Sequence, residues 1–586
     1  MTKNLFRVII IFALISIVFC APIFENPGNW GQRDWDEAFF WNGLARKTML
    51  EYKQFPLWNP YSRGGMEFLG YPHSTFVSPM FLFVLLCGVN AGLKVQIVIY
   101  LFLGLIGMYV LSRSLRLSRV SACLSAFVYS LSSIYAFHLS EGHIGWMAME
   151  LLPLFFFAYL KSVKNRSWII ISAAIFSLFL ACGSVDVTAI TLVFLAVYSV
   201  LFSLREKNVF PIGKMFAVFL CSGLLLSFKL VPMLRFLTTY SREINEIDGI
   251  GLSRVMEMLL SREQLGLYLV PFHERIMTYG WHEYGAYIGV IPLVLSIIGV
   301  FGYFKRHWPL ACTGLICLLV AMGNKSVIPV WHLLSRLPIY DSLRVPSRYI
   351  LGVIFCIAIF SGMGLEFLKK RVKIKTIPKA DCIKKVAFYG LLFFVMGDLF
   401  IVNSPIFKKA FLFPSKHIEA SDRFTQSRSD LIWTEQRWND LYPSFLANRG
   451  TLNSNEIMPI QSKALASGDL NYKGEVYLAN GNGRAYIQSF SPNNVFVKVK
   501  ATQDDILILN QNYYRGWKAI KKDQLCLAAN YNGLISSEIN PGIHEITFVF
   551  QPDDFKIGLL ISIMTIVGIC IFLMLELVSI HRKNTF

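Results

Sequence analysis

The chain has 586 residues, of which 54% are hydrophobic and only 16% are charged. Soluble domains carry roughly 25% charged residues, so these values exclude a single water-soluble fold and predict a protein that crosses a membrane several times. The formal net charge of +19 does not indicate a nucleic-acid partner, because most Lys and Arg residues lie in short gaps between apolar runs.

Apolar runs of spanning length follow one another along the chain and predict twelve membrane helices. With Lys3 and Arg7 on the cytoplasmic side, every basic gap and both termini fall on that side as well. The first run is expected to stay uncleaved, because bulky residues precede Cys20. The stretch 74–88 is short and contains Pro79, so it is expected to lie at the interface. The predicted spans are 5–23, 94–112, 118–137, 146–161, 167–182, 187–204, 212–231, 284–304, 308–322, 349–367, 386–402 and 557–579.

Polar segments on the outer side complete the expected organisation. Residues 403–556 alternate apolar and polar positions in runs such as NVFVKVKA and HEITFVF, separated by NG and PG turns, which predicts an antiparallel β-domain. We therefore expect a transmembrane domain over 1–402, an extracytoplasmic β-rich domain over 403–556, and a last helix with a cytoplasmic tail over 557–586. The outer loops of the first domain are 24–93, 232–283 and 323–348.

An acidic stretch, RDWDEAFFWN (33–42), follows the first apolar run and places Asp34, Asp36 and Glu37 at the outer membrane surface. Clustered carboxylates raise one another's pKa or bind a cation, although a solvated charged turn would look the same. The following loop, 54–76, is rich in Pro, Gly and aromatic residues, which predicts an ordered loop. Its rings suit a membrane interface or stacking on sugars.

Four stretches together resemble the YfhO family of bacterial membrane proteins, within the GT-C class of polyprenol-linked glycosyltransferases. The first is DWDE…FPLWNPYSRGGMEF…SP after the first helix. The others are HLSEGHIGWMAMELLPL (138–154), LRVPSRYILG (343–352), and the terminal segment 507–558 that runs into the last helix. This resemblance touches both ends and the middle of the chain. It implies a GT-C-like helical fold in the bacterial cytoplasmic (inner) membrane.

By that resemblance, an Asp of the first outer loop faces the acceptor and the donor's anomeric carbon. The role of general base falls to Asp36 or Asp34, with Asp36 preferred and Glu37 beside it, since an acceptor hydroxyl needs a positioned carboxylate to take its proton. Trp58 and Asn59 of the aromatic loop are assigned to the acceptor side.

The resemblance also implies cations for the lipid phosphate that leaves. Arg344 and Arg348 are four residues apart and share a helix face if the helix has begun, and guanidinium groups match phosphate oxygens. Arg242 is similar to a family position, and Lys229 is an ionisable residue near the outer end of an apolar helix. The alternative for these residues is snorkelling to lipid headgroups.

Glu141 and His143 occupy the second outer turn and are candidates for a second acid/base pair, or for a metal site with Asp36; an ordinary polar turn is the alternative. Asp186, in CGSVDV, is interpreted as structural. No zinc-protease motif is present, so a divalent metal stays open, and no other cofactor is expected.

The sequence therefore predicts an integral-membrane glycosyltransferase that moves a sugar from a polyprenyl-phosphate donor to an envelope glycopolymer, lipid or protein, in contact with membrane lipid and without nucleic acid. A transporter or flippase of lipid-linked saccharides would use the same basic residues without a base. A non-catalytic assembly protein would tolerate changes in the acidic loop.

Overall fold

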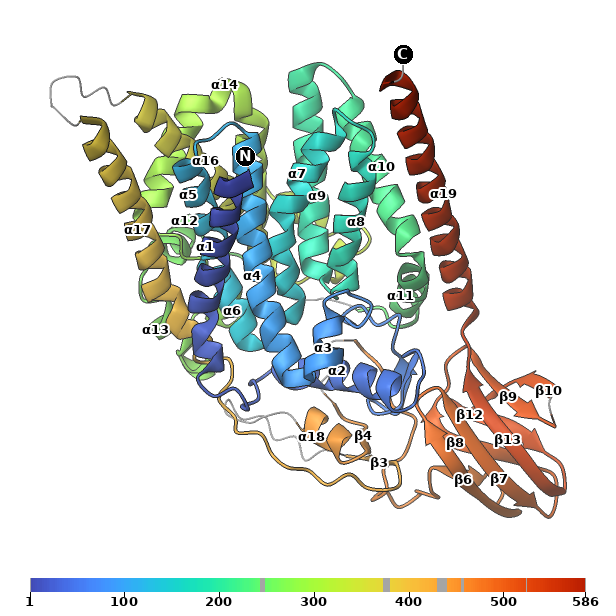
Figure 1. The fold of residues 1–586 in the computed structure, drawn as a ribbon. Helices are drawn as coiled ribbons and strands as arrows, with labels where there is room; N and C mark the ends of the chain where they lie inside the picture. The colour runs from blue at the N-terminus through green and yellow to red at the C-terminus, as the bar shows by residue number, and fades with distance from the viewer. Residues whose placement is uncertain are drawn as a thin grey trace.

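The computed structural model describes residues 2–242, 248–371, 380–428, 440–454, 458–522 and 524–584. A bundle of long apolar helices forms one body, and a β-rich body lies at one end of it (Figure 1). Both chain termini lie at the opposite end of the bundle (Figure 1). These two ends are called the β-domain end and the terminal end below.

Helices account for most of the chain. The α-helices are α1 (Thr2–Cys20), α2 (Trp35–Leu50), α3 (Phe81–Cys87), α4 (Val89–Ser114), α5 (Arg119–Ser130), α6 (Ser133–Glu141), α7 (Leu152–Ser162), α8 (Trp168–Ala181), α9 (Val185–Glu206), α10 (Phe210–Leu225), α11 (Ser227–Thr239), α12 (Leu252–Leu260), α13 (Gln264–Tyr268), α14 (Val290–Ala321), α15 (Val330–Leu334), α16 (Ile350–Arg371), α17 (Ala380–Phe407), α18 (Leu441–Leu446) and α19 (Asp553–Asn584). Short 3-10 helices are η1 (Ala21–Phe24), η2 (Ile144–Leu151), η3 (Phe272–Glu274), η4 (Trp281–Glu283), η5 (Tyr340–Ser342) and η6 (Pro346–Tyr349).

Within the described ranges, nine helices are long and apolar enough to cross a membrane, and the bent pair α10–α11 makes a tenth. The axes of α10 and α11 differ by 89°. Two features account for the difference from the twelve predicted spans. Helix α8 is apolar but short, and α14 is broken at His307, whose φ of −122° is not helical. Pro309 follows this break, where its ring cannot continue the preceding helix.

The break divides α14 into two arms that both pack on α16. Successive residues of the first arm contact residues nearer and nearer the C-terminal end of α16. Successive residues of the second arm contact residues nearer and nearer its N-terminal end, so the two arms are antiparallel. The close approaches that show this are Gly299 with Phe360, Gly302 with Phe367, Gly314 with Cys356, and Cys317 with Gly352. The predicted spans 284–304 and 308–322 correspond to these two arms.

Strands build the β-rich body and two small pairs. They are β1 (Trp58–Asn59), β2 (Met66–Glu67), β3 (Thr425–Ser427), β4 (Arg449–Thr451), β5 (Val476–Leu478), β6 (Gly483–Ser491), β7 (Asn494–Ala501), β8 (Asp505–Asn512), β9 (Trp517–Lys521), β10 (Gln524–Leu527), β11 (Ala529–Tyr531), β12 (Leu534–Ile539) and β13 (Gly542–Phe550). Two antiparallel sheets, ordered β10-β9-β13-β7-β6 and β11-β12-β8-β5, form the domain.

Alternation along the strands buries one face of each sheet. In β7, Val495, Val497 and Val499 are buried, and Phe548 and Ile546 of β13 lie opposite the first two. The predicted antiparallel β-domain is present. The less regular part before it contains α18 and the parallel pair β3–β4, and residues 429–439 of that part lie outside the described ranges.

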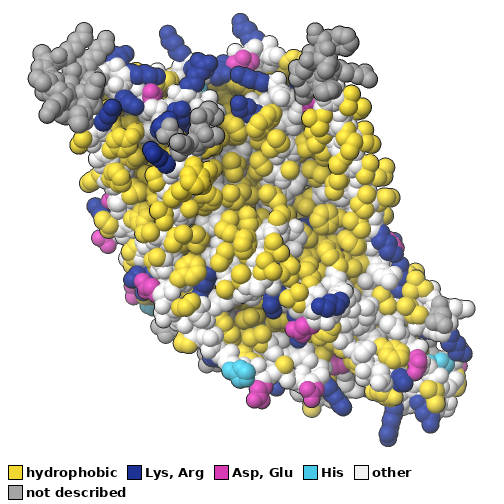
Figure 2. Space-filling view, in the orientation of Figure 1, with side chains coloured by type: hydrophobic (Ala, Val, Ile, Leu, Met, Phe, Trp, Pro, Cys, Tyr) yellow, Lys and Arg dark blue, Asp and Glu magenta, His cyan; other side chains and the backbone are white. Residues whose placement is uncertain are grey.

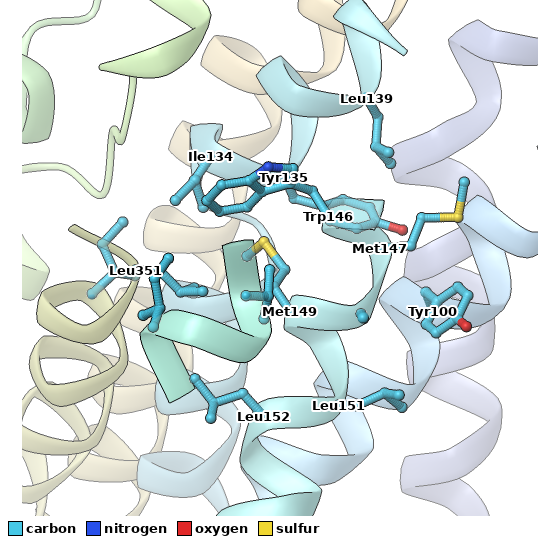
Figure 3. Packing of buried hydrophobic residues seen from close by; sticks show 14 of the residues in the cluster. Tyr100, Ile134, Tyr135, Leu139, Trp146, Met147, Met149, Leu151, Leu152 and Leu351 are labelled. Atoms are coloured by element: carbon cyan, nitrogen blue, oxygen red, sulfur yellow. The ribbon is translucent and has the colours of Figure 1, made fainter. Parts of the chain in front are cut away.

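Surface composition agrees with a membrane position. Figure 2 shows a broad hydrophobic belt across the visible face of the bundle, with Lys and Arg gathered beyond the belt at the terminal end. The interior is packed with aromatic and aliphatic side chains. Figure 3 shows Trp146 among Ile134, Tyr135 and Leu139 of α6. This packing holds the loops at the β-domain end of the bundle in place.

The β-rich body also holds the first loop, residues 24–93. The side-chain oxygen of Asn493 accepts the backbone N–H of Trp58 at 3.0 Å, and that of Gln511 accepts its indole N–H at 2.7 Å. Asn512 donates to the carbonyls of Arg63 and Gly65 at 2.8 and 3.1 Å. The first loop and the β-rich body therefore form one folded unit.

Candidate active site

Charged side chains from five segments meet at the β-domain end of the bundle. They come from the turn before α2, the turn after α6, the start of α9, η4 and η6. We call this group the polar cluster; its members are Asp34, Glu141, His143, Asp186, His282, Glu283 and Arg348.

Asp34 lies where the first loop touches the turn after α6. Its N–H donates to the carbonyl of Glu141 at 3.0 Å. Gly142 has a φ of +97°, and a Cβ there would lie 2.2 Å from the nitrogen of Trp35, so only glycine allows this approach. The Asp34 carboxylate lies 3.1 Å from Nε2 of His143, and 47% of its side chain is exposed. It is the open carboxylate of the cluster.

His143 lies between Asp34 and a second histidine. Its Nδ1 lies 2.9 Å from Nδ1 of His138, and the ring of His138 stacks on Trp146 at 3.6 Å. Burial alone would lower the pKa of His143, but the hydrogen bond and charge of Asp34, together with the charge of Glu283, raise it above its usual value. His143 is therefore favoured in the charged form beside Asp34.

Glu141 is buried and is satisfied by basic partners. Arg33 forms an ion pair with it, and Nδ1 of His282 lies 3.3 Å from its Oε1. The guanidinium of Arg33 also lies over the ring of Tyr268, 5.4 Å from the centroid. These contacts leave Glu141 as a positioning residue for the histidines around it.

Arg348 joins the two halves of the cluster. Its guanidinium contacts Asp186 at 2.8 Å and binds Glu283 through two parallel bonds of 2.5 and 2.7 Å. Burial alone would raise the pKa of Glu283, but the Arg348 charge holds it well below its usual range. Asp186, which the sequence suggested to be structural, is thus a partner of a predicted site residue.

Further cations lie beside Arg348. Burial and the charge of Arg344 lower the pKa of Arg242, and Arg344 lies over the ring of Tyr279 at 5.4 Å. Among the residues described, neither Arg242 nor Arg344 has a carboxylate partner. Lys229 is fully buried and donates to the carbonyls of Ser74 and Leu180 at 2.5 and 2.9 Å.

One triad of the cluster has the geometry of a metal site. The potential ligand atoms of His143, His282 and Glu283 all lie within 4.8 Å of one another. Asp36 is not available to the metal site expected with Glu141 and His143, because its carboxyl is buried against α18.

Asp36 is where the structure differs most from the expectation. Its side chain is fully buried, and its two oxygens accept the backbone N–H groups of Leu441 and Tyr442, each at 2.9 Å. Burial raises the pKa of Asp36 well above its usual value, against these two hydrogen bonds. The carboxyl group caps the first turn of α18 and has no open face for an acceptor. Glu37, in the next position of α2, is half-buried.

The expected acceptor residues of the aromatic loop are also corrected. Trp58 and Asn59 are fully buried. The Trp58 ring packs in the β-domain core against Trp517 and Phe550, at centroid distances of 5.2 and 4.9 Å. Asn59 accepts the N–H of Tyr61 at 2.9 Å. Neither side chain is available to stack on a sugar.

The sequence did not single out His282 of the polar cluster, or His138, which lies beside His143. His138 belongs to HLSEGHIGW, where only Glu141 and His143 were predicted to act. His282 stands in GWHEYG, between two glycines and beside an acid, in a long loop segment. A conspicuous His–Glu pair in such a loop is the signal that would have found it.

Comparison with known proteins supports a membrane family and only a distant structural likeness. The arabinofuranosyltransferase AftD from Mycobacteria has 14% identity and a TM-score of 0.49, over 78% of this chain and 32% of that one. The archaeal oligosaccharyltransferase AglB from Archaeoglobus fulgidus, solved with an inhibitory peptide and a dolichol-phosphate, has 11% identity and a TM-score of 0.43, over 78% of this chain and 64% of that one.

The chain thus spans less than two thirds of either structure, and with TM-scores below 0.5 neither contributes to the functional argument. No curated protein matches the chain. A family model described as "6-pyruvoyl-tetrahydropterin synthase related domain; membrane protein" matches residues 79–402, more than half of the sequence. The match is to this family rather than to the YfhO family. It covers α3 to most of α17, including every member of the polar cluster except Asp34. The chain therefore belongs to the family of 6-pyruvoyl-tetrahydropterin synthase related membrane proteins.

Proposed function

We propose that the protein is a GT-C-type glycosyltransferase of the bacterial cytoplasmic membrane. It takes a sugar from a polyprenyl-phosphate donor on the extracytoplasmic face and transfers it to an envelope glycopolymer, lipid or protein. The observation that carries the proposal is the half-exposed carboxylate of Asp34, which lies 3.1 Å from His143 in a polar cluster that also contains Arg348.

Asp34, rather than Asp36, is the proposed general base. Its side chain is open, whereas Asp36 is enclosed by α18. In the proposed step, the acceptor hydroxyl loses its proton to Asp34 and its oxygen bonds to the anomeric carbon. The bond from that carbon to the phosphate oxygen breaks, and the lipid phosphate leaves with the electron pair.

The donor phosphate is assigned to the cations beside Arg348. Asp186 and Glu283 already neutralise Arg348, so its role is to order the pocket wall. Arg242 and Arg344 have no carboxylate partner within the described ranges, whereas the predicted Lys229 is fully buried and bonded to backbone carbonyls, so it is not assigned to the phosphate. Cations without partners stabilise the negative charge that develops on the leaving phosphate.

The proposed orientation places the polar cluster outside the cell and both termini in the cytoplasm. The terminal end carries the Lys and Arg residues visible in Figure 2, which is the distribution that the positive-inside rule requires of a cytoplasmic side. On the extracytoplasmic side no nucleotide sugar is present, which agrees with a membrane-anchored donor.

The test is sugar transfer in membranes that contain the full chain. Radiolabelled polyprenyl-phosphate sugars serve as donors, and label is counted in envelope polymer, lipid and protein. Wild type, Asp34→Asn and Asp36→Asn are compared at matched protein levels. We expect Asp34→Asn to lose transfer while the labelled donor accumulates, and Asp36→Asn to retain transfer wherever it folds.

Two other outcomes would change the function. If both variants transfer normally, the base mechanism is wrong. Movement of labelled lipid-linked saccharide across vesicles without transfer would then favour the transporter or flippase. If neither sugar transfer nor movement of lipid-linked saccharide is found, the result would favour the non-catalytic assembly protein.

A further inference from the structure

The triad His143, His282 and Glu283 combines three properties that a plain hydrogen-bonded network does not need. Its candidate ligand atoms lie within 4.8 Å of one another. They come from two segments that are distant in the sequence, the turn after α6 and the 3-10 helix η4. These segments meet because α6 packs against η4. Two imidazoles and a carboxylate are a donor set that binds divalent transition metals.

The two nitrogens of His143 have different partners. Nδ1 faces Nδ1 of the buried His138 at 2.9 Å, whereas Nε2 lies 3.1 Å from the half-exposed carboxylate of Asp34, so an ion at Nε2 would take the place of the His143–Asp34 hydrogen bond. A metal-bound histidine usually passes its other N–H to a fixed acceptor. His138, held on Trp146 at 3.6 Å, provides that acceptor.

His282 supplies an independent observation. Its Nδ1 is buried and has no hydrogen-bond partner among the described residues, since the contact with Glu141 at 3.3 Å lacks hydrogen-bond geometry. Its Nε2 lies 3.7 Å from Oε1 of Glu283. A buried nitrogen without a partner is uncommon in folded proteins; an ion bound through Nδ1 would supply a partner and would lie beside Glu141.

The carboxylate of Glu283 already binds the guanidinium of Arg348. Glu283 can serve Arg348 and an ion together, because a carboxylate offers about four lone-pair sites.

We propose that His143, His282 and Glu283 form a binding site for one divalent transition-metal ion, beside the carboxylate of Asp34. Two imidazole donors favour Zn²⁺ or Co²⁺ over Mg²⁺ and Ca²⁺, which prefer oxygen ligands. The binding site stands on its own ligands, and its part in sugar transfer rests on the proposed function. When bound, such an ion supplies a Lewis acid beside Asp34.

The experiment measures metal content rather than activity alone. The full chain is purified in lipid nanodiscs with a histidine-free affinity tag, stripped with EDTA, and equilibrated with Zn²⁺, Co²⁺, Mn²⁺ or Mg²⁺. Bound metal is determined by inductively coupled plasma mass spectrometry, and Co²⁺ absorption reports the ligand set. We expect one Zn²⁺ or Co²⁺ ion per chain and no retained Mg²⁺.

Variants locate the ion. His143→Ala and His282→Ala should lose it, and His138→Phe, which keeps the stack on Trp146 but removes the nitrogen acceptor, should bind at least about tenfold more weakly. His273→Ala is the matched control, because that histidine is 77% exposed. Size-exclusion elution and thermal melting report folding. If His282→Ala unfolds, His282→Asp keeps a ligand oxygen and should retain weaker binding.

Metal binding and sugar transfer are then scored separately. Stripped wild type that takes up no ion, or a folded His282→Ala protein that binds as wild type does, overturns the metal site. If Asp34→Asn alone abolishes transfer in that case, the proposed function stands without it. If one ion binds at the triad but no sugar is transferred, the metal site stands and the proposed function fails.

Discussion

Replacing Asp36 by Asn should loosen the docking of α18 and leave the chemistry of the site in place. The two carboxylate oxygens accept the N–H groups of Leu441 and Tyr442, each at 2.9 Å. An amide of the same shape has only one acceptor oxygen, so one of these buried N–H groups faces an NH2 group instead. A buried donor without an acceptor costs about 1–3 kcal/mol.

Hydrogen–deuterium exchange by mass spectrometry measures this effect directly. A local cost of about 1–3 kcal/mol corresponds to roughly 5- to 150-fold faster exchange in the peptide that contains residues 441–446. Asp34→Asn is the matched control, because its side chain is half-exposed and does not contact α18; exchange in this peptide should not change. Sugar transfer should follow the reverse pattern, lost in Asp34→Asn and retained in Asp36→Asn.

One result would refute the reasoning. If Asp36→Asn keeps wild-type protection over residues 441–446 but loses transfer, Asp36 acts in the chemistry and not in the docking of α18. The preference for Asp36 as the base that the sequence suggested would then be restored, and Asp34 would be a partner of His143 only.

Three further predictions concern the first loop and the cations. Trp58→Ala should destabilise the β-rich body by about 3–5 kcal/mol, because the fully buried ring packs against Trp517 and Phe550; thermal melting measures this. Arg242→Gln and Arg344→Gln should each raise the KM for the lipid donor about tenfold or more, since charge-assisted bonds to phosphate are worth about 1.5–3 kcal/mol; transfer kinetics measure this. Burial raises the pKa of Glu67 from 4.5 to about 8, so the folded protein holds this proton more tightly than the unfolded chain. Wild type should therefore lose on the order of 4 kcal/mol of stability between pH 4.5 and 8, and Glu67→Gln should not; melting across that pH range measures this.

Controls separate each effect from a general loss of folding. Tyr486→Ala, at a ring that is 56% exposed on the same domain, should change stability little; an equal loss would contradict the burial argument for Trp58. Arg484→Gln, at an exposed residue of β6, should leave the donor KM unchanged. If Arg344→Gln also leaves the KM unchanged, the assignment of the donor phosphate to Arg344 is wrong. A pH profile of stability that is the same in wild type and Glu67→Gln would mean that Glu67 is ionised in the fold.

Local patterns in the sequence were sufficient for the architecture. Apolar runs such as 94–112 and 349–367 predict helices that the structure contains, because burial of backbone polar groups in lipid requires continuous helix. Alternation in NVFVKVKA predicts β7, because successive side chains of a strand point to opposite faces. The number of continuous spans differs from the twelve predicted, because the break of α14 at His307 and the bend after α10 depend on packing.

The site depended on contacts that no local pattern encodes. Asp34 and Asp36 are two residues apart, and sequence reasoning did not separate them. The fold does, because α2 turns Asp36 toward α18 and leaves Asp34 at the turn against His143. A Trp ring suits both a sugar-binding loop and a protein core, and only the packing of the β-sheets shows that Trp58 is a core residue. The sequence by itself therefore determined a helical membrane protein with a terminal β-domain and an acidic first loop. Only the tertiary structure joined Asp34, His143, His282, Glu283 and Arg348, because these residues are up to 314 positions apart and meet solely through helix packing.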